Sequence, residues 1–257
     1  MRMSNTLYKQ EQIGSLKVKV YKDRSSLGKA AAVEAAEEIR DRLNKQERVR
    51  IIFAAAPSQN EFLAALVQES GIDWNRVTAF QMDEYIGLPG DAPQRFSTFL
   101  RERMFDLVHP GEVHLIEDSA DIKHECERYA DLIRRSPIDL VLLGIGENGH
   151  IAFNDPPVAD FEDLEIMKPI ELELACRQQQ VNDGCFSSLD SVPMHALTLT
   201  IPTLMSGSRL FCMVPGPTKR DAVRATLDGP ISVQCPASIL RLHNACTLYL
   251  DRMSFGE

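Results

Sequence analysis

A glycine-rich stretch, residues 144–155, holds the residue types of a proton relay. It reads GIGENGHIAFND, and its glycines allow sharp turns and a close approach of the backbone to a ligand, which we expect at Gly146. His150 lies between two candidate hydrogen-bond partners, Asn148 and Asp155. A histidine beside a carboxylate is suited to proton transfer near neutral pH, whereas the alternative is a structural histidine bonded to the backbone.

The same stretch matches the pattern G-x-G-x-x-G, which occurs in dinucleotide sites. No helical pattern begins at Gly149, however, and two prolines follow at positions 156 and 157. We therefore exclude a dinucleotide-binding loop.

Two adjacent carboxylates, Asp83 and Glu84, follow the strand-like segment Val77–Met82. A carboxylate at the end of a buried strand is well placed to act as a general base. Because their Cα atoms are neighbours, one of the two can face a pocket while the other holds the loop. Our candidate catalytic residue is Asp83, and Glu84 is a candidate substrate-binding residue. The alternative is a pair of solvated loop acids.

Two further loops predict an anion site. The loop 54–60, AAAPSQN, joins a strand-like run to a helix, where backbone N–H groups, the Ser58 hydroxyl and Gln59 could meet an anion. The alternative is a plain turn with Ser58 as a helix N-cap. Lys219 and Arg220 open a predicted helix, where a cation opposes the helix dipole unless it meets an anion. Their alternative role is that of solvated charges.

These loops alternate with strand-like and helix-like segments along the chain. Ser25 and Ser26 are the candidate N-caps of the first helix. The predicted strands are Lys17–Tyr21, Val49–Ala54, Val77–Met82, Glu112–Ile116, Ile138–Gly144, Ala196–Ile201, Arg209–Val214 and Cys246–Leu250. The predicted helices are Leu27–Asn44, Glu61–Glu69, Thr98–Leu107, Ala120–Arg135 and Thr218–Leu227.

Apolar strands that alternate with helices predict an α/β fold with one doubly wound, mostly parallel sheet covered by helices on both faces. Ligands of such sheets bind beyond the carboxyl ends of the strands, where all four loops described above would meet. We expect a single domain over residues 1–257. Its polar and irregular segment 156–193 is a candidate lid, although a structural buttress or a surface loop is an equal alternative.

Composition excludes several classes of protein. The 257 residues carry 28 Lys and Arg against 37 Asp and Glu, a formal net charge of -9, which argues against nucleic acid and anionic membranes as partners. No run approaches the ~20 apolar residues of a membrane span, and residues 1–16 lack the apolar core of a secretory signal. The six cysteines form no CxxC pair, so we expect free thiols in a cytoplasmic protein and no metal site.

Several motifs resemble one enzyme family. Residues 77–89, VTAFQMDEYIGLP, are similar to the MDEYxGLP segment of glucosamine-6-phosphate deaminases, and residues 143–154, LGIGENGHIAFN, are similar to their GxGxxGHIAFNEP segment. The runs ALTLT (196–200) and CPASIL (235–240), with Lys219 between them, resemble the family's C-terminal third. The resemblance extends over nearly the whole chain in the same order.

The resemblance implies the fold shared with sugar-phosphate isomerases. It also implies conversion of glucosamine 6-phosphate and water to fructose 6-phosphate and ammonia, without a cofactor. In that reaction, Asp83 would move a proton between C2 and C1, and His150 would help to open the pyranose ring. Lys219 and Ser58 would bind the phosphate.

The chain departs from the family's pattern at several positions. The phosphate loop, usually similar to ATGSTP, reads AAAPSQ here, so a glycine is lost and Pro57 removes an N–H donor. Asp155 stands where the family usually has Glu, and Asn148 stands where some members have Asp. The nearest candidate for the family's other phosphate-binding arginine is Arg177.

We therefore expect a deaminating aldose–ketose isomerase acting on glucosamine 6-phosphate or a close relative. The alternatives are a 6-phosphogluconolactonase-type hydrolase and a non-catalytic paralogue that binds sugar phosphates. Tyr85, Phe153 and Asn154 favour the deaminase branch, because lactonases typically have Arg after the Asp-Glu pair and a GHxAS segment. Retention of Asp83 and His150 argues against a non-catalytic protein. The sequence is compatible with a homo-oligomer.

Overall fold

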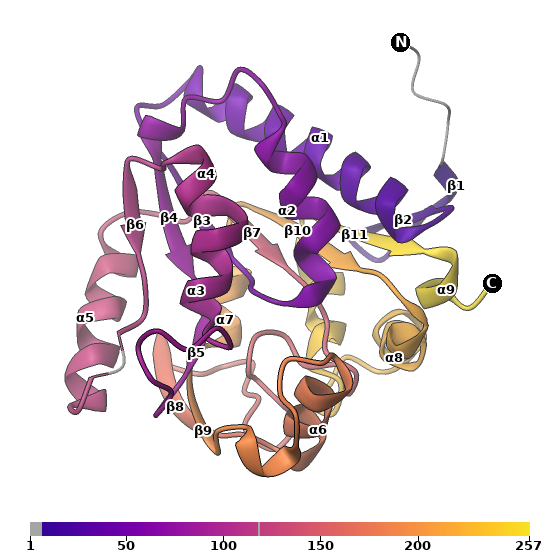
Figure 1. Cartoon of the computed structure of the whole chain (residues 1–257). Helices are drawn as coiled ribbons and strands as arrows, with labels where there is room; N and C mark the ends of the chain where they lie inside the picture. Colours follow the sequence, from indigo (N-terminus) through magenta and orange to yellow (C-terminus); the bar gives the residue numbers. More distant parts are fainter. Residues whose placement is uncertain (1–6, 118) are drawn as a thin grey trace.

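A mostly parallel sheet runs through the protein (Figure 1). The structure is a computed structural model that describes residues 7–117 and 119–257. Among the described residues, eight strands form it in the order β1-β2-β11-β10-β7-β3-β4-β6. Their bounds are β1 Leu7–Ile13, β2 Leu16–Tyr21, β3 Val49–Phe53, β4 Val77–Gln81, β6 Glu112–His114, β7 Leu140–Leu143, β10 Arg209–Val214 and β11 Cys246–Asp251. β1 and β2 pair antiparallel, and the other neighbouring strands pair parallel. The predicted α/β class with a mostly parallel sheet is thereby confirmed.

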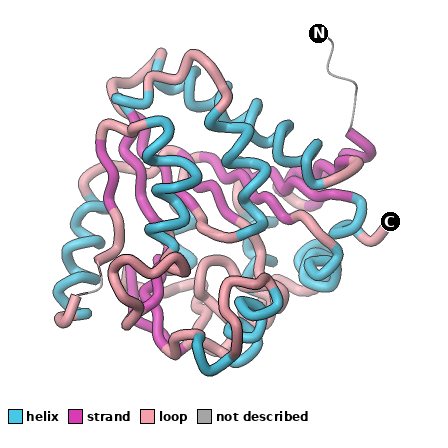
Figure 2. Tube along the Cα trace, in the orientation of Figure 1, coloured by secondary structure: helices cyan, strands magenta, loops and turns pink. Residues whose placement is uncertain are grey.

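Helices cover both faces of this sheet (Figure 2). Their bounds are α1 Arg24–Leu43, α2 Asn60–Val67, α3 Phe96–Leu100, α4 Asp106–Val108, α5 Ile122–Arg134, α6 Leu174–Asn182, α7 Ile201–Met205, α8 Arg220–Asp228 and α9 Arg252–Phe255. The predicted helix Thr98–Leu107 is found as α3 and α4 joined by a π-helical turn, Arg101–Phe105. The first helix is capped by Asp23, whose carboxylate accepts a hydrogen bond of 2.8 Å from Ser26 N, so the predicted caps Ser25 and Ser26 were wrong.

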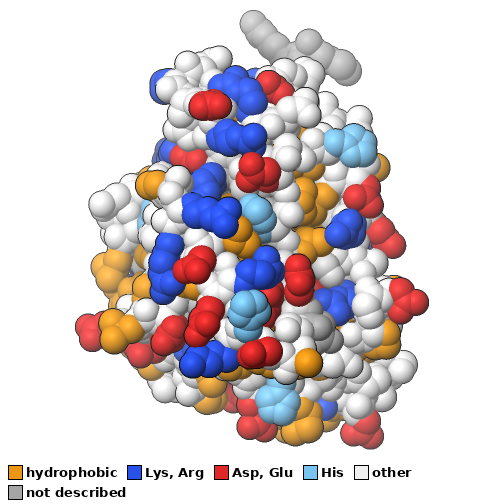
Figure 3. Space-filling model, turned by 90° about the vertical axis from the view of Figure 1, so that its left-hand side faces the viewer, with side chains coloured by type: hydrophobic (Ala, Val, Ile, Leu, Met, Phe, Trp, Pro, Cys, Tyr) orange, Lys and Arg blue, Asp and Glu red, His pale blue; other side chains and the backbone are white. Residues whose placement is uncertain are grey.

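On the surface that α5 and β6 contribute, positive and negative side chains are interspersed (Figure 3). None of the helices in the described part of the chain is long and apolar enough to cross a membrane.

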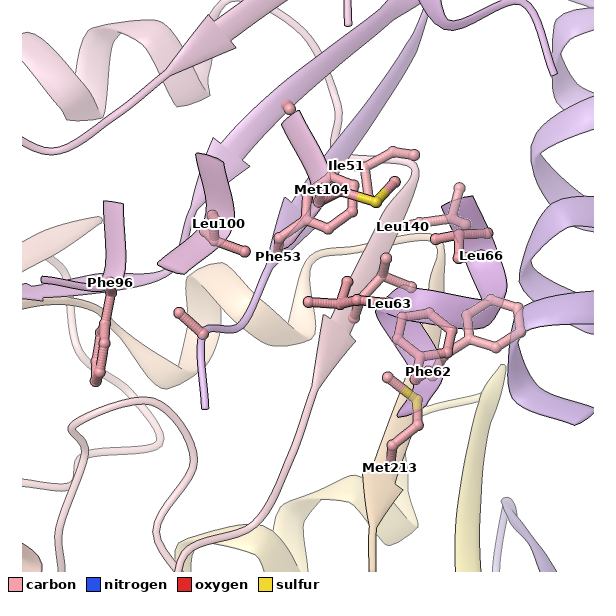
Figure 4. Packing of buried hydrophobic residues seen from close by; sticks show 14 of the residues in the cluster. Ile51, Phe53, Phe62, Leu63, Leu66, Phe96, Leu100, Met104, Leu140 and Met213 are labelled. Carbon is pink, nitrogen blue, oxygen red and sulfur yellow. The ribbon is translucent and has the colours of Figure 1, made fainter. Parts of the chain in front are cut away.

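The core consists of two apolar clusters, one on each face of the large sheet. Alternate residues of one strand enter different clusters: Leu140 and Leu142 pack on the side of α1 and α2, whereas Val141 and Leu143 pack on the side of α5, α7 and α8. Figure 4 shows α2 against the first of these faces, with labelled side chains that include Phe62, Leu63, Leu66, Ile51, Phe53, Leu140 and Met213. Burial on both faces explains why the central strands are continuous apolar runs.

A second, smaller sheet lies below the large one (Figure 1). It consists of β5 Asp83–Tyr85, β9 His195–Leu199 and β8 Met167–Glu171, paired antiparallel in the order β5-β9-β8. The prediction of one sheet was therefore incomplete, because Ala196–Ile201 does not join the large sheet. The segment 156–193 was expected to be irregular, but it contains β8 and α6. Both elements lack a strong sequence period, and β8 forms only by pairing with the distant β9.

Candidate active site

An open cavity lies where the loops after β3, β4, β7 and β10 converge, at the carboxyl ends of these parallel strands. The predicted site residues that line it are Ser58, Gln59, Asp83, Gly146, His150 and Lys219. The structure therefore brings together side chains from all four loops singled out in the sequence.

His150 is held by two partners on one side of its ring. Its Nδ1 lies 2.7 Å from Asn148 Oδ1 and 2.9 Å from Asp155 Oδ1. Asn148 Nδ2 donates to Asp155 Oδ1 at 2.7 Å, so the three side chains form one network. Asn148 and Asp155 do not line the cavity and lie behind the histidine. No described residue bonds His150 Nε2, which leaves that nitrogen for a ligand.

The backbone around His150 requires glycine at two places. A Cβ on Gly146 would come within 2.1 Å of the His150 ring, so only glycine lets the ring pack against this turn. Gly149 has a φ of 87°, in the left-handed region that other residues rarely adopt. Gly146 N and Gly149 N close the turn by donating to His150 O and Gly146 O. These glycines therefore set the position of the histidine.

The carboxylate of Asp155 is buried yet favoured in its ionised form. Burial opposes ionisation, but His150 and the hydrogen bond from Asn148 hold the pKa of Asp155 below its ordinary value. A carboxylate in this state fixes the orientation of the imidazole. The network has the form of a relay that can give or take a proton at Nε2.

Asp83 presents a second ionisable group to the cavity, from the start of β5. It is 6% exposed, and burial, reinforced by the adjacent Glu84, raises its pKa well above the ordinary value. A carboxylate with a raised pKa is a stronger base than an exposed one. Asp83 and His150 thus offer two proton-transfer groups to one bound molecule.

Glu84 does not line the cavity, although the sequence pointed to substrate binding. Its Oε1 accepts from Phe96 N at 3.0 Å and its Oε2 from Ser97 N at 2.9 Å, at the start of α3. Gln81 Nε2 also donates to Oε2, at 3.0 Å. Side chains alternate along a strand, so with Asp83 facing the cavity its neighbour faces the helix. Glu84 therefore caps α3 and anchors β5.

Lys219 carries the positive charge of the cavity. It lies in the short turn Pro217–Lys219 before α8 and is only 5% exposed. Burial lowers its pKa, whereas the carboxylates of Asp183 and Glu147 act in the opposite direction. No described residue bonds its ammonium group, which is therefore free to meet an anion. Its neighbour Arg220 is exposed and lies outside the cavity lining.

Arg177, the candidate second phosphate ligand, is engaged elsewhere. Its guanidinium donates to Leu189 O at 2.8 Å and to Val192 O at 3.0 Å, which ties α6 to the segment that follows it. The structure does not place Arg177 in the cavity lining.

The contribution of α6 to the cavity was not predicted from the sequence. Gln179, Gln180 and Asp183 line it, and Gln179 Oε1 accepts a hydrogen bond of 2.8 Å from Glu147 N. Phe96 at the start of α3 was missed as well. The run of glutamines was visible in the sequence, but no local pattern related it to the glycine-rich loop.

Three buried donors near the relay could in principle hold a metal ion: His150, Asp155 and Cys176, whose ligand atoms lie within 4.8 Å of one another. His150 and Asp155 already bond each other, however. Burial also raises the pKa of the Cys176 thiol well above its ordinary value, which disfavours the thiolate that metals bind. The arrangement therefore favours proton transfer over metal binding.

Comparison with known proteins gives concordant matches. Residues 22–167 match the family of glucosamine-6-phosphate isomerases and 6-phosphogluconolactonase. The glucosamine-6-phosphate deaminase of Halothermothrix orenii is 37% identical over 194 residues, which cover 74% of this chain and 78% of that protein. The enzyme of the same name from Exiguobacterium sibiricum is 35% identical over 228 residues, covering 85% of this chain and 88% of that protein.

Solved structures agree with these matches. A monomeric glucosamine-6-phosphate deaminase superposes with a TM-score of 0.84 at 30% identity, covering 93% of this chain and 98% of that chain. A 6-phosphogluconolactonase from Thermotoga maritima superposes with a TM-score of 0.75 at 19% identity, covering 92% of this chain and 99% of that chain. The second likeness concerns the fold alone.

Proposed function

This chain belongs to the family of glucosamine-6-phosphate isomerases and 6-phosphogluconolactonases, and from that premise we propose that it is a glucosamine-6-phosphate deaminase. It converts glucosamine 6-phosphate and water to fructose 6-phosphate and ammonia. The observation that carries the proposal is that Asp83, the His150 relay and Lys219 all face one cavity.

The reaction begins with ring opening. His150, oriented through Nδ1 by Asn148 and Asp155, donates a proton from Nε2 to the ring oxygen as the C1–O5 bond breaks. Loss of the proton from the C1 hydroxyl then leaves an aldehyde at C1. A histidine is suited to this step because its proton can leave and return near neutral pH.

The second step moves hydrogen within the open chain. Asp83 removes the proton from C2 while the C1 oxygen takes up a proton, which forms an enolamine, and Asp83 then returns its proton to C1. The product is an iminium at C2, and water adds to it and releases ammonia to leave the ketose. The raised pKa of Asp83 suits a base that must take up a proton from carbon and hold it.

The phosphate end of the substrate would lie at Lys219 and Ser58. A buried lysine without a partner supplies a fixed positive charge, and Gln59 and the loop backbone add neutral donors. Pro57 removes one N–H donor from this loop. We therefore assign most of the phosphate binding to Lys219.

We further propose that α6, within the segment 156–193, acts as a lid of a single domain. Gln179 and Gln180 of this helix line the cavity. Glu147 N donates a hydrogen bond to Gln179, which holds the helix against the glycine-rich loop, residues 144–155. The six cysteines are free thiols, which supports a cytoplasmic location.

The deciding assay is release of ammonia and fructose 6-phosphate from glucosamine 6-phosphate by the purified protein. Asp83→Asn should bind the substrate yet lose about 100- to 10,000-fold in turnover, because it removes a general base. Equal turnover in the variant would remove Asp83 from the mechanism. Higher turnover of 6-phosphogluconolactone than of the amino sugar would replace the proposed deaminase by a lactonase.

A further inference from the structure

Asp183 places a carboxylate in the cavity, close enough to Lys219 to favour its charged form. It directly follows α6, its side chain is exposed, and it lines the cavity with Lys219, Ser58 and Gln59. Its Oδ2 accepts a hydrogen bond of 3.3 Å from Gln179 Nε2, one turn earlier on the same helix. The proposed lid thus carries a negative charge to the end of the cavity where the phosphate is expected.

Positive charge is scarce at this end. Among the described residues that line the cavity, Lys219 is the one Lys or Arg. Arg220 points to solvent, with Asp221 at 3.7 Å, and Arg177 is bound to backbone carbonyls outside the lining. A phosphate that enters therefore meets one buried cation and one carboxylate.

The next cation, Arg24 at the start of α1, is engaged by other groups. Its Nε lies 2.5 Å from Glu61 Oε1, and its Nη2 donates to Glu61 Oε2 at 2.9 Å and to the Pro57 carbonyl at 3.2 Å. Arg24 does not line the cavity. The charge of Asp183 helps to keep Arg24 protonated, but the guanidinium is already paired with the carboxylate of Glu61.

Lys219 itself is under the influence of carboxylates before any ligand arrives. Asp183 and Glu147 both favour its charged form against the effect of burial. A phosphate that binds Lys219 therefore comes near the negative charges of these two carboxylates. Like charges repel more strongly in a partly desolvated cavity than in bulk water.

We propose that Asp183 is a specificity-determining residue that opposes a doubly charged phosphate at Lys219 and favours substrates with less negative charge at that end. The inference rests on the proposed function, because it concerns the phosphate of the same substrate. We therefore expect sugar phosphates to bind this protein more weakly than they would bind a variant without a carboxylate at position 183.

The test is a charge series at position 183, assayed with glucosamine 6-phosphate and with inorganic phosphate as a competitive inhibitor. Asp183→Asn should lower KM and the phosphate inhibition constant about three- to tenfold, and Asp183→Lys should lower both further. Asn keeps an acceptor for Gln179, so the helix end remains bonded. KM for unphosphorylated glucosamine should not fall. Asp190→Asn, an exposed carboxylate of the same segment outside the cavity lining, is the matched control.

The outcomes separate this inference from the proposed function. Unchanged KM and phosphate inhibition in both position-183 variants, with wild-type turnover intact, would overturn the role of Asp183 alone. An equal fall in Asp190→Asn would also overturn it, because the effect would then be general surface charge. If the wild type shows no turnover, the proposed function fails, and calorimetry with inorganic phosphate on wild type and Asp183→Asn still decides whether Asp183 opposes phosphate.

Discussion

Neighbouring side chains in this site have different tasks because the backbone sends them to different places. Asp83 faces the cavity, while Glu84 accepts hydrogen bonds from the first N–H groups of α3. Lys219 is buried in the cavity lining, while Arg220 is exposed. In each pair the residue types are nearly equivalent in chemistry, so position alone separates a group that lines the cavity from one that does not.

Lys219 and its neighbour Arg220 provide a matched pair of variants. Lys219→Ala is expected to raise KM for glucosamine 6-phosphate about 10- to 100-fold, because a charged hydrogen bond contributes ~1.5–3 kcal/mol. The change in kcat should be smaller, since a phosphate anchor binds the ground state and the transition state alike. Steady-state kinetics measure both constants.

Arg220→Ala is the control for this variant, because it removes the adjacent charge outside the cavity lining. Its KM should stay within about twofold of the wild type. A loss confined to kcat in Lys219→Ala would instead place Lys219 at the reacting centre.

Among the elements, α6 is linked to the glycine-rich loop, residues 144–155, through a buried side chain. Gln179 lies on α6 and is 6% exposed, and its Oε1 accepts from Glu147 N in the glycine-rich loop. Gln178, the preceding residue, is exposed, and among the described residues its side chain bonds Asn182 alone, on the same helix. The same residue type thus occurs once at the contact and once away from it.

We expect Gln179→Ala to loosen the docking of α6 on the loop. A neutral hydrogen bond contributes ~0.5–1.5 kcal/mol, so opening of α6 should become roughly 2- to 10-fold more frequent. Amide hydrogen exchange of residues 174–182 measures this directly. Gln178→Ala should exchange at nearly the wild-type rate. Identical exchange in the two variants would show that the Gln179 bond does not hold the helix in place.

At the scale of the whole molecule, the parallel sheet brings distant loops together. Residues 58, 150 and 219 lie in three separate connections and residue 83 begins β5, yet all four line one cavity. The small sheet contributes Asp83 by pairing β5 with β9, more than 100 residues later in the chain. Ionisable groups buried in this way couple the stability of the fold to pH.

Asp83→Asn is expected to stabilise the folded protein at neutral pH. The pKa of Asp83 lies well above its ordinary value of 3.8 in the folded state, so the folded state holds this proton more tightly than the unfolded chain. The stability that this proton contributes is complete below the unfolded value and is lost as pH rises through the folded pKa. Asparagine does not ionise, so the variant does not lose this stability as pH rises.

Denaturant unfolding of wild type and Asp83→Asn from pH 4 to pH 8 measures this effect. The variant's advantage should be smallest near pH 4 and grow toward neutral pH. The opposite pH response of Asp155, whose pKa is lowered, is common to both proteins and cancels in the difference. A variant that is less stable at every pH would contradict the burial of a costly charge at Asp83.

The sequence by itself determined the features that local patterns encode. Runs rich in apolar residues predicted β3, β4, β7 and β10 to within one or two residues, because strands buried on both faces need mostly apolar side chains. The glycines of residues 144–149 predicted a sharp turn beneath His150. The rule that ligands bind at the carboxyl ends of parallel strands then placed Asp83, His150 and Lys219 in one region.

Only the tertiary structure decided which side chains enter the cavity. The direction of Glu84 depends on the pairing of β5, since one step along a strand reverses the face of a side chain. The place of Arg177, Gln179 and Asp183 depends on how α6 packs against a loop some 30 residues earlier, and no local period encodes that contact. Secondary structure follows from neighbours in the chain, whereas a binding site follows from neighbours in space.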